Sequence, residues 1–84
     1  MTGDDFVSRA LSAIELMALG YAHVPDDVAN QSLARIGGNL LREWRGLLPV
    51  TVLPDVALAE VVEDVLARVR TRRREIEAAD VGSA

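Results

Sequence analysis

The residues best suited to chemistry in this chain are five arginines crowded between Arg68 and Arg74. Guanidinium groups pair with phosphate and carboxylate oxygens, so a stripe of them on one helix could follow a nucleic-acid backbone. However, the chain carries a net charge of -4 at pH 7, and three acidic residues follow the arginines between Glu75 and Asp80. Interleaved charges on a helix usually mark a solvated face. A solvated face and protein contact are both compatible with this end, with nucleic-acid binding through Arg68–Arg74 as a further alternative.

Few other residues have the types and spacing that enzymatic chemistry needs. The sole histidine, His23, falls in an expected loop without an evident base partner, and no serine, histidine and acid suggest a triad. Asp26 and Asp27 could bind a cation, but carboxylates at a helix start already complement the helix dipole. The chain contains no cysteine, which removes disulfides and cysteine-based zinc or redox sites. We expect a protein that is not an enzyme and holds no metal or other cofactor.

Composition favours a small, acidic helical protein with apolar surface to spare. Half of the 84 residues are hydrophobic but only 4% are aromatic, so aliphatic side chains must build the core. A chain of this length buries only about 60% of its extended surface on folding, which favours burial of the surplus against a partner. All nine basic residues are arginine, a bias typical of a GC-rich bacterium or its phage. No signal peptide or membrane span is evident, which predicts a cytoplasmic location.

The spacing of apolar residues predicts an all-α fold, a small three-helix bundle with a long, partly overhanging C-terminal helix. Pro25 and Pro54 are expected as the first residues of the second and third helices. At 1.5 Å per residue the third helix would span roughly 39 Å and the first roughly 24 Å, so several turns should overhang. The expected helices are residues 4–19, 25–46 and 54–79, in a single domain over 1–80 with a disordered tail at 81–84.

Two leucines of the first helix fall outside its apolar face. Leu16 and Leu19 project away from the main arc, and Leu19 shares its side with Ser8 and Ser12. In a monomer this side of the helix would face water and would normally be polar, so a second contact surface is one interpretation. Isolated exposed leucines are common in folded proteins and are the other. The side chains expected to face the core are Phe6, Val7, Ala10, Leu11, Ala13, Ile14, Met17, Ala18 and Tyr21.

Adjacent glycines interrupt the second helix. Gly37 and Gly38 each cost about 1 kcal/mol relative to alanine in a helix interior. Gly37 sits at the edge of the apolar seam, where a small residue allows another helix to approach closely. Gly38 points outward, where packing gives no reason for a glycine, so a break at 37–38 is as compatible with the sequence as a continuous helix. The seam itself comprises Ala29, Leu33, Ile36, Leu40, Trp44 and Leu47.

The third helix carries an apolar stripe that arginines interrupt. Apolar residues recur at alternating steps of four and three from Leu58 to Val69. Arg72 and Arg73 then fall within the continuation of the stripe, on either side of Ile76. We expect Val69 to be close to the last residue that the chain itself buries, with Ile76 left for a partner or for water. The predicted partner-binding residues are Leu16, Leu19, Val65, Val69, Arg72, Arg73 and Ile76.

Parts of the chain resemble the acyl and peptidyl carrier proteins, which are small, acidic and helical. Gln31-Ser32-Leu33 resembles the site where these proteins place a phosphopantetheine-bearing serine before a leucine at a helix start. Residues 48–53 resemble their Leu-Pro-Val-x-x-Leu segment, and residues 54–57 resemble the Pro-Thr-Val-Ala that opens their final helix. The resemblance implies that Ser32 carries the prosthetic arm, while the thioester chemistry belongs to partner enzymes.

A competing alignment of the same family removes the attachment site. It places residues 36–39 on the Leu-Gly-Gly-x that precedes the serine, so that Leu40 stands where the serine should be. Our leading interpretation is therefore a small accessory, assembly or regulatory protein of a bacterium or phage. It would act through protein contact and self-associate through the leucines of the first helix or the apolar stripe of the third. A carrier bearing its arm on Ser32 is a further alternative.

Overall fold

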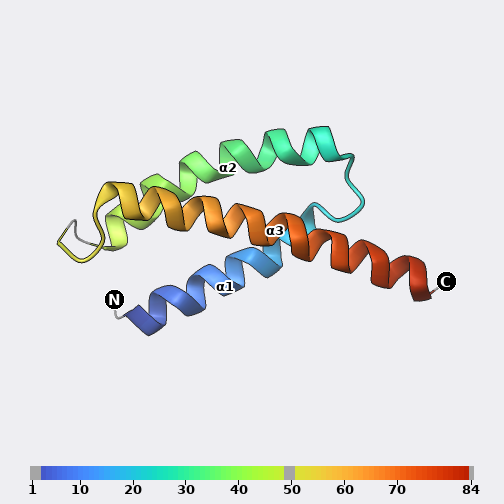
Figure 1. The fold of residues 1–84 in the computed structure, drawn as a ribbon, viewed down its shortest axis with the longest axis horizontal. Coiled ribbons are helices and arrows are strands. Elements are labelled where there is room, and N and C mark those ends of the chain that lie inside the picture. Colours follow the sequence, from blue (N-terminus) through green and yellow to red (C-terminus); the bar gives the residue numbers. More distant parts are fainter. Residues whose placement is uncertain (1–2, 49–50, 84) are drawn as a thin grey trace.

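The computed structural model describes the backbone of residues 3–48 and 51–83 and the side chains of residues 4–48 and 51–80. Within these residues it contains α1 (Gly3–Gly20), α2 (Asp26–Leu47) and α3 (Asp55–Ser83), and no strand. The predicted all-α three-helix bundle is confirmed. Helices α1 and α3 run in the same direction and α2 in the opposite one, and the end of α3 extends past the α1–α2 connection (Figure 1).

The helix boundaries differ from the predicted ones by small, explicable amounts. Pro25 precedes α2 with φ -53° and ψ 140°, and the helix begins one residue later, at Asp26. The carbonyl of Pro54 accepts a hydrogen bond from the N–H of Leu58 at 2.9 Å, and α3 likewise begins one residue after this proline. Helix α3 continues to Ser83, so the predicted tail at 81–84 is wrong for residues 81–83. Residue 84 lies outside the described residues.

Helix α2 passes through the two glycines without a break. Gly37 is buried, and a Cβ atom at this position would lie only 2.9 Å from Leu66 Cδ1 of α3. The predicted role of Gly37 in close helix approach is therefore confirmed. A Cβ atom at Gly38 would meet nothing within 4 Å, so no neighbouring atom explains the second glycine.

Helix α3 is the element against which both other helices pack. No Cα atom of α1 lies within 8 Å of a Cα atom of α2, whereas both helices approach α3 within this distance. The rings of Phe6 in α1 and Trp44 in α2 meet edge to face, with centroids 5.2 Å apart and an interplanar angle of 79°, a favourable aromatic geometry. The buried core comprises Ile14, Ala18, Leu33, Leu40, Trp44, Leu58, Val62, Val65, Leu66 and Val69.

The two glycines should respond in opposite directions to added side chains. Gly37→Leu should lower the free energy of unfolding by about 1–3 kcal/mol, because the new side chain collides with Leu66. Gly38→Ala should raise it by about 1 kcal/mol, because only helix propensity changes there. Urea denaturation followed by circular dichroism measures both. Equal effects of the two substitutions would contradict the close approach at Gly37.

Candidate protein-contact surface

The chain's own core already covers the apolar stripe of α3. Val65 and Val69 are buried in the hydrophobic core, so neither side chain offers area to a partner, which corrects the expectation that they would contact one. Burial also continues past Val69, because Ile76 is partly buried and packs against the core. The predicted limit of burial at Val69 is therefore wrong by about two helical turns.

Arg73 explains why the core continues. The residue is only 4% exposed, and its Nε donates to the carbonyl oxygen of Tyr21 at 2.7 Å. Its Nη2 donates to the carbonyl oxygen of Val24, and its Nη1 donates to Asp26 Oδ1 at 2.8 Å. A carboxylate oxygen of Glu77 lies 3.4 Å from Nε. Arg73 therefore clamps the α1–α2 connection onto α3, which corrects the expectation that it faces a partner.

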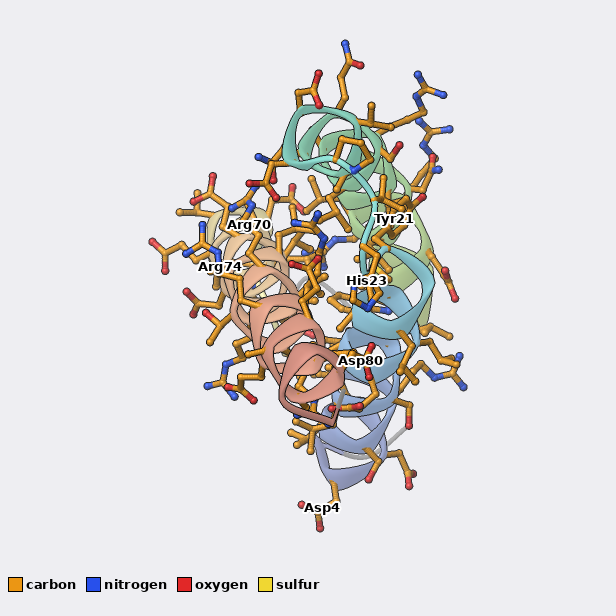
Figure 2. The ribbon with its side chains drawn as sticks, turned by 90° about the vertical axis from the view of Figure 1, so that its right-hand side faces the viewer. Asp4, Tyr21, His23, Arg70, Arg74 and Asp80 are labelled. Atoms are coloured by element: carbon orange, nitrogen blue, oxygen red, sulfur yellow. The ribbon has the colours of Figure 1, made fainter. Side chains whose placement is uncertain are left out.

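The last turns of α3 hold the same connection at His23. This residue has a left-handed φ of 67°, and its backbone N–H donates to Glu77 Oε1 at 2.9 Å. His23 Nε2 lies 2.6 Å from Asp80 Oδ2, and Figure 2 shows these side chains next to each other at the end of α3. The sequence showed no base partner for His23 because Asp80 is 57 positions away. Among the described side chains of residues 4–48 and 51–80, no three histidine or acidic side chains form a group that could hold a metal ion.

The arginine cluster is divided among separate partners. Arg72 Nε donates to Glu15 Oε1 of α1 at 2.7 Å, and its Nη1 donates to Glu75 Oε2 at 3.2 Å. The hydrogen bond with Glu15 contributes most to a raised pKa of Arg72. Arg70 Nε donates to Asn30 Oδ1 of α2 at 3.3 Å. The guanidinium group of the neighbouring Arg73 is buried. Arg70, Arg72 and Arg73 therefore hold the helices of the bundle together and do not form one continuous stripe.

Exposed apolar area remains on α1. Leu16 is 71% exposed and Leu19 is 59% exposed, so both lie outside the core face as their helical projection predicted. They share this side of α1 with Ser8 and Ser12, which are exposed as well. Of the predicted partner-binding residues, these two leucines are the ones whose apolar side chains are largely free of the chain's own core.

Sequence reasoning missed two further exposed residues of α1. Val7 and Leu11 are 54% and 51% exposed, although they were expected to face the core. They line a groove of about 260 Å³ between α1 and α3. Ala18 projects to an angle between those of Val7 and Leu11 and is nevertheless fully buried. The difference arises because α1 diverges from α3 toward its N-terminal end (Figure 1), which periodicity along the sequence does not reveal.

Ser32 does not occupy the position that a carrier protein requires. Helix α2 begins at Asp26, so residues 26–31 precede the serine within the same helix, and its side chain is half-buried. The resemblance placed it at a helix start, and the structure corrects this. The similar segment at 48–53 includes residues 49 and 50, which lie outside the described residues.

Comparisons of the chain with protein-family models, with curated proteins and with solved structures found no match. Within the described residues, no helix has the length and apolar character that crossing a membrane demands. The proposals below therefore depend on the chain's own geometry.

Loss of the buried clamp should destabilise the whole bundle. Arg73→Met should lower the free energy of unfolding by at least about 2 kcal/mol, because the carbonyl groups of Tyr21 and Val24 lose their donors. Arg74→Met is the matched control, because Arg74 is exposed and its loss should change stability by less than about 0.5 kcal/mol. Chemical denaturation measures both, and equal values for the two variants would contradict the clamp.

Asp26 should make stability depend on pH in acid. The hydrogen bond from Arg73, together with the charge of that guanidinium, lowers the pKa of Asp26 below its ordinary value of 3.8. The resulting stabilisation is present above pH 3.8 and disappears as the pH falls through the lower folded-state pKa. Asp26→Asn should therefore reduce stability at neutral pH but much less in strong acid. Denaturation curves across this range test the sign, and a difference independent of pH would contradict it.

Proposed function

We propose that this chain acts by protein contact through α1 and that it associates with a second copy of itself. The observation that supports the proposal is the exposure of four large apolar side chains on this helix, two on its outward side and two beside α3, each more than half accessible to water. Contact between such residues lowers the free energy by about 25 cal/mol for each Å² of apolar surface removed from water. The four side chains are Val7, Leu11, Leu16 and Leu19.

A second copy suits the outward side of α1 for geometric reasons. In a two-fold dimer the same patch lies on both subunits, so an apolar pair such as Leu16 and Leu19 meets its own equivalent. The small side chains of Ser8 and Ser12 share this side of the helix and are exposed, so they allow another helix to come close. The apolar stripe of α3, the other surface considered for self-association, is unsuitable because it is buried.

Protein contact is favoured over the alternatives by the way the charged and polar groups are used. Arg70, Arg72 and Arg73 each hold a group elsewhere in the bundle, which leaves little of the cluster for a phosphate backbone. Ser32 lies in the body of α2, away from the helix start that a carrier would use. The proposed role involves no catalytic step and no cofactor.

Self-association can be tested by light scattering coupled to size exclusion over a range of concentrations. The unmodified chain should approach twice the mass of one chain as concentration rises. The double variant Leu16→Glu, Leu19→Glu should stay at the mass of one chain, because the dimer would bury four unpaired carboxylates.

Val56→Glu is the matched control for this experiment. Val56 is an exposed apolar residue on α3, so the same chemical change is made away from α1 and the dimer should persist. Circular dichroism confirms that all variants stay helical. A chain that is strictly monomeric from micromolar to millimolar concentration would overturn self-association. Loss of the dimer in Val56→Glu but not in the double variant would overturn its assignment to α1.

A further inference from the structure

A groove of about 440 Å³ lies between the second half of α2 and the first turns of α3. This end of the bundle is opposite to the α1–α2 connection (Figure 1). Leu41, Leu58 and Ala59 form its apolar wall. The volume falls within the range of about 300–1,000 Å³ that is typical of small-molecule sites, and the groove is shallow and open to solvent. None of the exposed apolar residues of α1 lines this groove.

Gly38 keeps part of the groove open. It lines the groove, it is exposed in the middle of a continuous helix, and a Cβ atom there would meet nothing within 4 Å. Alanine at this position would favour the helix by about 1 kcal/mol, and no packing contact excludes it. Glycine at this position leaves the groove wider than a larger residue would, although neither helix propensity nor packing favours it.

Two guanidinium groups line the same groove. Arg45 Nη1 donates to the carbonyl oxygen of Leu48 at 3.3 Å, whereas its Nε and Nη2 are buried without a hydrogen-bond partner. Asp55 Oδ1 lies 2.9 Å from Nε, close enough for attraction although no hydrogen bond forms. Arg42 is exposed. Nη2 has neither a hydrogen-bond partner nor a salt bridge, which costs about 1–3 kcal/mol for a buried donor. An acceptor that displaced Asp55 and reached this nitrogen would therefore be stabilising.

We propose that this groove binds a carboxylate carried on an apolar chain, the chemistry of a medium-chain fatty acid. The carboxylate would accept hydrogen bonds from Arg42 and from the donors of Arg45, replacing the largely exposed side chain of Asp55. The apolar chain would lie against Leu58 and across Gly38. This site uses α2 and α3 and not α1, so it stands or falls independently of the proposed self-association.

Titration of the full chain with sodium octanoate, followed by amide chemical shifts in NMR, tests the proposal. Saturable shifts should centre on residues 38–45 and 55–59. Two probes separate the contributions of the carboxylate and of the alkyl chain to binding. Octan-1-ol keeps the alkyl chain without the charge, and acetate keeps the charge without the long alkyl chain. Each should bind at least about tenfold more weakly than octanoate. Equal binding of either probe, or the absence of a saturable shift with octanoate, would overturn the proposal.

Variants within α2 then locate the site. Gly38→Leu fills the groove and should weaken octanoate binding by about tenfold or more. Gly46→Leu is the matched control, because Gly46 lies in the same helix with nothing within 4 Å of an added Cβ atom but does not line the groove. Its affinity should be unchanged.

Arg42→Gln provides an independent test should Gly38→Leu fail to fold. It removes one donor at an exposed position and should weaken octanoate binding while leaving the thermal unfolding midpoint unchanged. Unchanged affinity in Arg42→Gln, or in a folded Gly38→Leu, would overturn the assignment of the site.

Discussion

A single buried guanidinium group holds the three helices in their arrangement. Helices α1 and α2 do not approach each other along their backbones, so their relative position depends on α3, on the short connection between them and on the contact of Phe6 with Trp44. Arg73 fixes that connection by donating to two of its carbonyl oxygens and to the first residue of α2. A buried charge is tolerated only when it is well paired. Arg73 can therefore be buried only where these acceptors lie around it, and the two carbonyl oxygens in turn need its N–H groups as donors.

The clamp also determines which surfaces the molecule presents. By drawing the connection onto α3, it extends the contacts of α3 past Val69, while α1 and α2 cover the apolar stripe itself. His23, held in a left-handed backbone conformation by Glu77 and Asp80, is part of the same arrangement. A non-glycine residue in this conformation costs of order 1–3 kcal/mol and persists when its surroundings impose it. Among the described residues, four of the seven large apolar side chains that are exposed lie on α1.

The two proposed sites share no residue, which follows from the way α3 separates the flanking helices. Contact through α1 uses apolar side chains that face away from the core or stand where α1 diverges from α3. The groove between α2 and α3 uses Arg42, Arg45 and Gly38, of which Arg45 also pairs with Asp55 and donates to the carbonyl oxygen of Leu48. The unpartnered Nη2 of Arg45 and the exposed Gly38 within a helix each lower stability without benefiting packing, and both support the proposed site.

The sequence by itself determined the three helices, their boundaries to within a few residues, the seam of α2, the stripe of α3 and the role of Gly37. These features follow from the periodicity of a helix, which is a local property. Only the tertiary structure decided that Arg73 is buried, that His23 meets Asp80, and that Val7 and Leu11 are exposed while Ala18 is covered. Those outcomes depend on the angle between helices and on partners about 50 positions apart, and no local pattern of residue types contains either.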